Sequence, residues 1–226
     1  FPTRRSSDLV ARFSYELARR RGEARGERPS LTVSAKTNML PATDRWFSDI
    51  VAEIGAAEYP DVKLTRYIVD DMAHRLVTQT EELDVLLLPN LYGDVLSDLG
   101  AGTVGGMGLA PSGCYGDDYA YFESAHGTAP DIAGQHRINP TATLLSAVMM
   151  LEWLGDRHGD EQLLMASRLL ERAIDRVFAS GRVRPFEFGG SDGTQAITRA
   201  VVDALAQADA LQRGSFLSDG DFLARS

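Results

Sequence analysis

The sequence is poor in cysteine, in long apolar runs and in positive charge. Cys114 is the only cysteine among 226 residues, so no disulfide can form within the chain and a reducing compartment is expected. No apolar run approaches the roughly 20 residues of a membrane-spanning helix, and no signal peptide is recognisable. The 32 acids outnumber the 23 lysines and arginines, which gives a net charge of −9. This excess argues against nucleic acid or an anionic membrane as the partner, and we expect a cytoplasmic protein.

The first nine residues, Phe1 to Leu9, lack an initiator methionine and bear no relation to the sequence that follows. They look like the translation of a sequencing-adapter tail, so residues 1–9 are predicted to be non-native and are excluded from the fold. On this interpretation the chain is a fragment, and its true N-terminal part precedes what is present.

The hydrophobic pattern alternates between strands and helices. Short apolar runs predict strands, and apolar residues spaced by three or four predict helices. Thr43 and Asp44 are expected to cap the second helix. The expected strands are 31–36, 62–69, 85–88 and 119–124, and the expected helices are 10–21, 43–57, 72–83, 94–99, 140–154, 161–180 and 193–211. Strands that alternate with helices predict an α/β fold with any site at the strand ends.

Seven glycines between Gly100 and Gly116 interrupt this alternation. They indicate turns and close packing where one structural unit gives way to another. Their spacing is not the GxGxxG pattern that precedes a capped helix, so a Rossmann dinucleotide site is not supported.

Two acids, Asp94 and Asp98, follow the third predicted strand, with Gly93 expected to make the turn. Residues four apart share a helix face, with Cβ atoms roughly 5–6 Å apart. No lysine or arginine nearby in the sequence relieves the repulsion between the two carboxylates. Mg²⁺ would relieve it, because this ion prefers oxygen ligands and takes one or two carboxylates. The alternative is an ordinary helix start, where Asp94 caps and Asp98 faces solvent.

Three further places carry candidate residues. Lys36 ends the first predicted strand, and the alternative to a functional role is a solvated lysine. Asp70 ends the second predicted strand, and the alternative there is a helix cap. The loop from His126 to Asn139 is rich in glycine, proline and aspartate, and its N–H groups and carboxylate suit a ribose and an adenine. An unspecific surface loop is the alternative there. No Ser/His/Asp order and no Cys/His metal spacing stands out.

Several motifs together resemble the metal-dependent β-decarboxylating dehydrogenases, the family of isocitrate, isopropylmalate, homoisocitrate and tartrate/malate dehydrogenases. The motifs are NLYGDVLSDL at 90–99, HGTAPDIAG at 126–134, NPTA at 139–142 and LSAVMML at 145–151. The likeness runs from about Val10 to Leu205. It implies a three-layer α/β fold that is not a Rossmann fold and is incomplete in this chain.

The resemblance assigns roles to the candidate residues. Asp94 and Asp98 match the metal-binding acids of one subunit, and Asp70 matches a third acid that the neighbouring subunit supplies. Lys36 matches the catalytic lysine, which is also donated across the interface, and Asn38 lies where a cofactor or substrate contact is found. The family likeness therefore implies Mg²⁺ or Mn²⁺ and a homodimer with shared active sites.

The dinucleotide site is implied by Glu123 and by residues of the following loop: His126, Gly127, Thr128, Ala129, Pro130, Asp131, Ile132 and Asn139. Asp131 would accept hydrogen bonds from the ribose hydroxyls and would repel a 2′-phosphate. NADP-using relatives tend to carry Lys and then Tyr at the positions of Asp131 and Ile132. The expected cofactor is therefore NAD.

The implied function is NAD-dependent oxidative decarboxylation of a 3-substituted malate, closest to isocitrate, with 3-isopropylmalate or homoisocitrate as the alternative. The substrate arginines, the specificity loop and the catalytic tyrosine of the family lie upstream of Val10. A non-catalytic regulatory subunit and an inactive fragment are the alternatives of another class. The expected domains are 10–104, part of the small domain with the dimer interface and metal acids, 105–207, part of the large NAD-binding domain, and 208–226, a tail.

Overall fold

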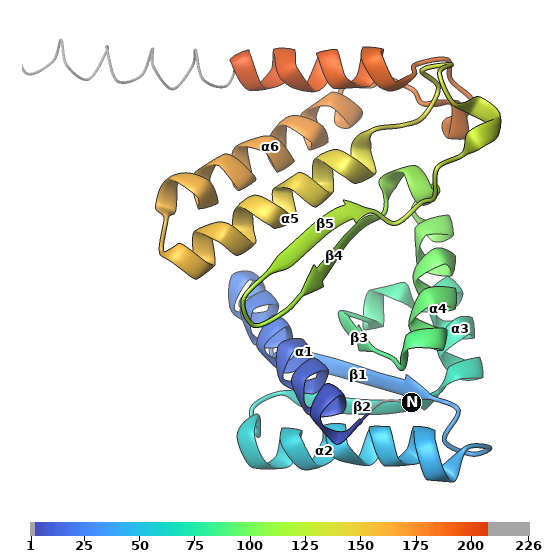
Figure 1. The fold of residues 1–226 in the computed structure, drawn as a ribbon, viewed down its shortest axis with the longest axis vertical. Helices are drawn as coiled ribbons and strands as arrows, with labels where there is room; N and C mark the ends of the chain where they lie inside the picture. Colours follow the sequence, from blue (N-terminus) through green and yellow to red (C-terminus); the bar gives the residue numbers. More distant parts are fainter. Residues whose placement is uncertain (1–2, 208–226) are drawn as a thin grey trace, which may run out of the picture. The chain divides into compact units, whose positions relative to one another are not determined.

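The computed structural model describes residues 3–207 (Figure 1). The chain divides between residues 103 and 104 into two compact units. Each unit has its own hydrophobic core and carries one part of the candidate site, so the two are described separately.

A three-stranded parallel sheet forms the centre of the first unit. Its order is β2-β1-β3, so the first strand lies between the other two (Figure 1). Parallel neighbours need crossover connections, and helices supply them. The strands are β1 (Ser30–Ala35), β2 (Lys63–Ile68) and β3 (Val85–Leu87), and the helices are α1 (Arg4–Arg25), α2 (Trp46–Glu58), α3 (Val69–Thr78) and α4 (Asn90–Thr103), with a 3₁₀ turn at Thr80–Glu82.

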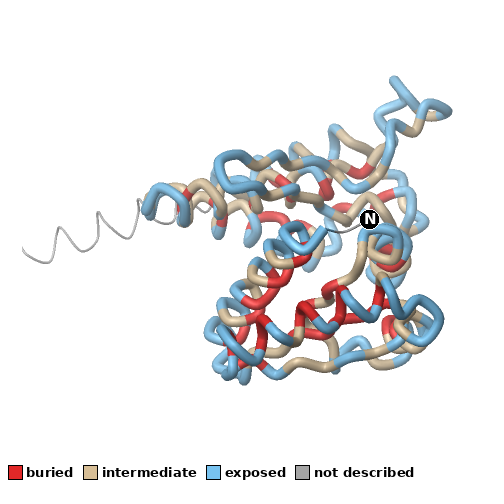
Figure 2. Tube along the Cα trace, turned by 60° about the horizontal axis from the view of Figure 1, so that its bottom comes forward, coloured by how far each residue is buried: buried red, intermediate tan, exposed pale blue. Residues whose placement is uncertain are grey.

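Helices cover both faces of this sheet. On one face Leu31 and Val33 of β1 pack with the buried sides of α1 and α2, and Figure 2 shows the resulting core in red. On the other face Leu86 of β3 packs with Met72 of α3 and Leu96 of α4. The alternation of side chains along each strand therefore gives a helix–sheet–helix sandwich.

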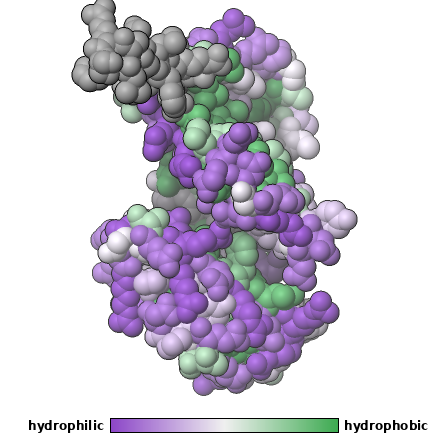
Figure 3. Space-filling view, turned by 90° about the vertical axis from the view of Figure 1, so that its left-hand side faces the viewer, coloured by the Kyte–Doolittle hydropathy of each residue, from purple (hydrophilic) through white to green (hydrophobic). Residues whose placement is uncertain are grey.

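The outer side of the first unit is charged. Arg12 of α1 donates two hydrogen bonds to Glu58 of α2, and Arg19 pairs with Asp61. Figure 3 shows mainly hydrophilic colours over this part of the surface. These pairs tie α1 to the end of α2 and to the turn that follows it.

The first helix begins earlier than the pattern predicted. It starts at Arg4 instead of Val10, and Thr3 caps it by accepting a hydrogen bond from the Ser6 N–H. Residues 4–9 therefore lie within α1, and Ser7 is buried. The adapter origin of residues 1–9 stays a prediction.

Two other helix starts also differ from the prediction. Residues Pro41–Arg45 form a π-turn, and α2 starts at Trp46 without a capping hydrogen bond from a side chain of the described chain, so the predicted Thr43–Asp44 cap is wrong. Gly93 lies within α4, because its N–H already donates to the Pro89 carbonyl at 2.9 Å. The turn predicted at Gly93 therefore comes earlier, at Pro89.

The second unit packs helices on a two-stranded antiparallel ribbon. Strands β4 (Pro111–Tyr115) and β5 (Ala120–Ser124) form the ribbon, and α5 (Thr141–His158) lies against it. The core lies between α5, α6 (Glu161–Ala179) and a helix over residues 194–207, with Ile197 fully buried. Strand β4 was not predicted, because its sequence lies in the glycine-rich segment.

Within residues 3–207, no helix is both long and apolar enough to cross a membrane. The helix predicted at 193–211 is described as far as residue 207. The end of that helix and the predicted tail 208–226 lie outside the described residues.

Candidate functional site

The carboxyl ends of the three parallel strands collect the charged candidates of the first unit. Lys36 follows β1, Asp70 follows β2, and α4 begins shortly after β3. The Lys36 Nζ donates to Asp70 Oδ2 and forms an ion pair with it. This hydrogen bond is the main reason that the pKa of Asp70 lies below its usual value. Two residues 34 positions apart are thus brought together at one edge of the sheet.

The backbone of Lys36 is held on both sides. Its carbonyl accepts hydrogen bonds from the N–H groups of Met39 and Leu40 at 3.0 and 2.9 Å. Its N–H donates to Asp44 Oδ2 at 2.8 Å, and Asp44 is buried with 7% exposure. Sequence reasoning missed this contact, because Asp44 was assigned to a helix cap.

Asp94 and Asp98 lie on α4, and both are exposed. The Asn90 amide is 3.4 Å from Asp94 Oδ2. Among residues 3–207, no three His, Cys, Asp or Glu side chains are arranged to hold a metal ion. A single chain therefore offers two exposed carboxylates on one helix, which fits Mg²⁺ or Mn²⁺ as part of a coordination sphere and requires other ligands to complete it.

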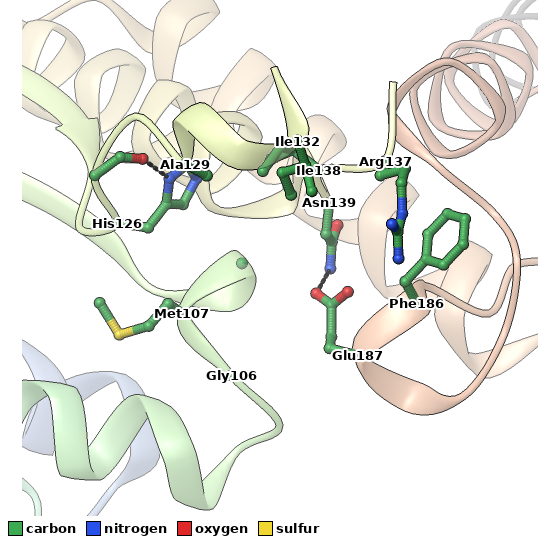
Figure 4. A pocket seen from close by; sticks show the side chains of 12 residues that line it. Gly106, Met107, His126, Ala129, Ile132, Arg137, Ile138, Asn139, Phe186 and Glu187 are labelled. Atoms are coloured by element: carbon green, nitrogen blue, oxygen red, sulfur yellow. Dashed lines mark hydrogen bonds between the residues drawn. The ribbon is translucent and has the colours of Figure 1, made fainter. Parts of the chain in front are cut away.

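A cavity of about 400 Å³ lies within the second unit (Figure 4). The middle of the glycine-rich segment, the loop after β5 and the 3₁₀ turn Phe186–Phe188 form its wall. Its volume is in the range of small-molecule and cofactor pockets. The lining residues are Gly106, Met107, Gly108, His126, Gly127, Ala129, Ile132, Arg137, Ile138, Asn139, Phe186 and Glu187.

Asn139 and Glu187 form the polar wall of the cavity. The Asn139 Nδ2 donates to Glu187 Oε1 at 2.8 Å (Figure 4). The Asn139 Oδ1 accepts from the Thr141 N–H at 3.1 Å. Gly108 lies so close that a Cβ there would come within 2.6 Å of Glu187 Oε1. A larger residue at this position would therefore have to displace the Glu187 carboxylate from its place beside Asn139.

His126 leaves one polar atom unsatisfied. Its Nδ1 lies 2.9 Å from the Gly127 carbonyl oxygen, so the ring proton is assigned to Nδ1 and Nε2 becomes an acceptor. Nε2 is buried and has no hydrogen-bond partner among the described residues. A buried acceptor without a donor is costly. The His126 side chain lines the cavity, while its Nε2 is enclosed by protein atoms.

The loop from His126 to Asn139 is fixed by the start of the last described helix. Thr194 N–H donates to the His136 carbonyl at 2.8 Å, and His136 itself has φ of +54°. A Cβ at Gly193 would come within 2.0 Å of the same carbonyl oxygen. This contact holds the loop in one conformation at the cavity.

The family model for isocitrate/isopropylmalate dehydrogenase matches residues 3–205. The chain belongs to this family. An isocitrate/homoisocitrate dehydrogenase from Thermus thermophilus is 43% identical over 90% of this chain and 57% of its own length. A 3-isopropylmalate/3-methylmalate dehydrogenase from Methanocaldococcus jannaschii is 41% identical over 85% of this chain and 55% of its own length.

A solved isocitrate dehydrogenase from Methylococcus capsulatus has the same fold, with a TM-score of 0.81 and 38% identity over 91% of this chain and 57% of its own. The predicted isocitrate/isopropylmalate dehydrogenase fold is therefore confirmed. The chain spans about half the length of the curated relatives it matches.

Some of the predicted cofactor-binding residues line the cavity and others do not. His126, Gly127, Ala129, Ile132 and Asn139 line the cavity. Asp131 is exposed in the 3₁₀ turn Pro130–Ile132, and Asn38 is exposed in the turn after β1 of the first unit. The other predicted residues, Glu123, Thr128 and Pro130, are exposed in β5 and the loop, outside the set that lines the cavity.

Sequence reasoning missed part of the cavity wall. Met107, Phe186 and Glu187 lie in segments without a helical or strand periodicity. One signal was available: Glu187 is an acid between two phenylalanines, just before the paired Gly189 and Gly190. An acid in a glycine- and proline-rich turn is a candidate for a site on a loop.

Proposed function

We propose that the chain is part of an NAD-dependent dehydrogenase that oxidises and decarboxylates a 3-substituted malate, with isocitrate as the substrate and 2-oxoglutarate as the product. The observation that carries the proposal is the Lys36–Asp70 ion pair at the carboxyl ends of β1 and β2. The same edge leads into α4 with its two exposed acids. A base and three carboxylates are the groups that this chemistry needs.

The metal would be held by Asp94 and Asp98 of one chain and by Asp70 of a second chain. Bound Mg²⁺ or Mn²⁺ would act as a Lewis acid on the C2 hydroxyl and a carboxylate oxygen of the substrate. Both α4 acids are exposed, as ligands to a metal shared with another chain must be.

Lys36 is proposed as the general base for the C2 hydroxyl proton. Its ammonium is paired with Asp70, which is proposed as a metal ligand of the same site. When Asp70 turns to a metal, the lysine loses a negative neighbour and gains a positive one. Both changes favour the neutral amine, which can accept a proton.

NAD is proposed to bind in the cavity of the second unit and to take the hydride from the substrate. Ile132 and Ile138 line the cavity and offer apolar contacts to the adenine ring. Asp131 stands exposed on the loop, where its carboxylate would bind ribose hydroxyls and repel a 2′-phosphate. The residues present therefore fit the non-phosphorylated cofactor.

A homodimer with shared sites is proposed from the surface of α3 and α4. Three large apolar side chains are exposed there: Val77 at 60%, Leu91 at 68% and Val95 at 60%. Exposed apolar side chains on two helices of the same unit are available for burial in an interface. With Lys36 and Asp70 donated across it, each site would contain residues of both chains.

Subunit complementation tests this arrangement in the full-length protein. Lys36→Met and Asp94→Asn are each expected to lower NADH formation from isocitrate by about 100-fold or more. Co-expression of the two variants should restore about a quarter of the wild-type activity, because half of the dimers are mixed and each has one intact site in two. If each site were built from one chain, the mixture would stay at the low activity of the single variants. That result would refute the shared site.

The substrate is tested by comparing kcat/KM for isocitrate, 3-isopropylmalate and homoisocitrate. The names of the relatives cover all three, and isocitrate is expected to be preferred. A higher kcat/KM for one of the other two acids would change the proposed substrate but leave the proposed reaction type unchanged. No turnover of any of the three acids would favour a regulatory subunit. The described residues alone, which lack the family's upstream substrate arginines, are proposed to be inactive. The cytoplasmic location stays a prediction.

A further inference from the structure

We propose that Asp44 is a positioning residue for Lys36: its buried carboxylate fixes the main chain from which the lysine side chain extends. The inference rests on the proposed role of Lys36 as a base. It assigns to Asp44 a role in turnover that is separate from the stability of α2.

The geometry around Asp44 supports this assignment. Lys36 is the first residue after β1, where the ladder hydrogen bonds of the sheet have ended. Its N–H donates to Asp44 Oδ2 at 2.8 Å in place of a ladder partner. The second oxygen, Oδ1, accepts from the Thr43 hydroxyl at 3.1 Å. Both oxygens of the carboxylate are therefore oriented.

The segment between Lys36 and Asp44 folds back on Lys36 through main-chain hydrogen bonds. Leu40 N–H donates to the Lys36 carbonyl, and the N–H groups of Asp44 and Arg45 donate to the Leu40 carbonyl at 3.0 and 3.2 Å. The π-turn at Pro41–Arg45 aims Asp44 at Lys36 and away from the first N–H groups of α2. A helix cap at this position would have left the Lys36 N–H unsatisfied.

Burial of Asp44 makes its hydrogen bond with the Lys36 N–H important for stability. Asp44 is 7% exposed, and a buried carboxylate is tolerated only when hydrogen bonds compensate its lost hydration. A hydrogen bond to an ionised acceptor is about twice as strong as a neutral one.

Kinetics of the full-length protein test the proposal. Asp44→Ala is expected to lower kcat about 10- to 100-fold with both KM values nearly unchanged, because a displacement of about 1 Å costs up to 100-fold. Asp44→Asn keeps an oxygen that can accept the Lys36 N–H and should retain kcat within about fivefold. Tyr15→Phe is the control, since the buried Tyr15 hydroxyl donates to the Val51 carbonyl at 3.0 Å, away from Lys36.

Amide hydrogen exchange gives a readout that does not depend on activity. In the wild type the Lys36 amide should exchange slowly, and Asp44→Ala should speed it about tenfold or more relative to the Val33 amide of the same strand. Tyr15→Phe should leave that ratio unchanged.

Two results would overturn the proposal. One is a Lys36 amide whose relative exchange is the same in Asp44→Ala as in the wild type. The other is a kcat for Asp44→Ala that stays within twofold of that of the Tyr15→Phe control. A wild-type protein that oxidises none of the three substrates would refute the proposed function, while the exchange result would still decide the contact between Asp44 and Lys36.

Discussion

The charged edge of the first unit is formed by Lys36, Asp70 and the α4 acids at the carboxyl ends of the strands. This edge and the cavity of the second unit differ in how the hydrogen bonds of their polar groups are satisfied. At the edge, Lys36 pairs with Asp70, and the Lys36 N–H pairs with Asp44. In the cavity, Nε2 of His126 is buried with no partner among residues 3–207, and about 400 Å³ lies open. The edge therefore pairs its buried and charged groups at Lys36, Asp70 and Asp44, although the Ser34 Oγ of β1 is also buried without a partner among residues 3–207, whereas the cavity leaves open space for a ligand.

This difference predicts two kinds of binding. A ligand in the cavity meets a largely apolar lining that includes Ile132, Ile138 and Phe186, so binding depends on shape and on apolar contact. A metal at the edge must compete with the Lys36 ammonium for Asp70, so binding depends on charge. Substitutions at the edge should therefore change the rate, and substitutions at the cavity should change cofactor affinity.

The largest effect is expected from Lys36→Met in the full-length protein. Removing a general base costs about 10²–10⁴-fold in rate, so kcat should fall by that factor while the KM for NAD stays near the wild-type value. The measurement is steady-state NADH formation. Lys63→Met is the matched control, because Lys63 is the only other lysine in the sequence and lies exposed at the start of β2.

Equal losses of kcat in the Lys36→Met and Lys63→Met variants would show that removing a lysine charge lowers the rate wherever that lysine lies. The distinction between a rate-determining edge and an affinity-determining cavity would then fail.

The next effect is the loss of metal binding in Asp94→Asn and Asp98→Asn. Each change removes one negative charge from a site that relies on few carboxylates, so Mn²⁺ affinity should fall by about 100-fold or more. Calorimetric titration with Mn²⁺ measures it. Glu81→Gln is the control, since Glu81 is an exposed acid of the 3₁₀ turn after α3. Wild-type Mn²⁺ affinity in both aspartate variants would remove α4 from the metal site.

The sequence predicts the edge better than the cavity, for physical reasons. Residues at strand ends are marked by the apolar runs before them, so Lys36 and Asp70 could be picked out by position alone. The parallel register then brings them together. The acids of α4 were found from helical spacing, although the helix begins at Asn90, ahead of the predicted turn.

Contacts made by loops could not be predicted. Glu187 meets Asn139 across 48 positions, and neither residue lies in a periodic segment. Strand β4 was hidden by the glycines around it, and it forms because β5 pairs with it residue by residue. Asp44 has the sequence signature of a helix cap, and the π-turn that redirects it is set by tertiary contacts.

Asp131→Lys should have a smaller effect, confined to the cofactor. Replacing a ribose-binding carboxylate by an ammonium is expected to raise the KM for NAD about tenfold and to improve the relative use of NADP. The measurement is kcat/KM with each cofactor. Asp175→Lys, an exposed acid of α6, makes the same charge change elsewhere. Unchanged NAD kinetics in Asp131→Lys would refute the role of Asp131.

Glu187→Ala tests the wall of the cavity that the sequence did not reveal. The change removes the acceptor of the Asn139 amide, so that buried side chain loses an anchor. The KM for NAD should rise about three- to tenfold, in line with one lost hydrogen bond to a charged group, and kcat should change less. Glu171→Ala on the exposed side of α6 is the control. A fall in kcat without a change in KM would contradict the distinction between cavity and edge.

The smallest expected effect is on the stability of the fold at low pH, and it tests whether Lys36 and Asp70 pair within one chain. The pKa of Asp70 is lowered chiefly by its hydrogen bond from Lys36. A carboxyl whose folded pKa is depressed stabilises the fold above its unfolded pKa, about 3.9, and this contribution is lost as the pH falls through the folded pKa. Lys36→Met should return the Asp70 pKa, measured by carbon NMR without metal, towards 3.9, and Lys63→Met should not. Because the Asp70 side chain is 59% exposed, the difference in Tm at pH 7 should be small, and it should vanish as the carboxyl is protonated. An Asp70 pKa that is the same in the wild type and in Lys36→Met would mean that the pair does not form in solution.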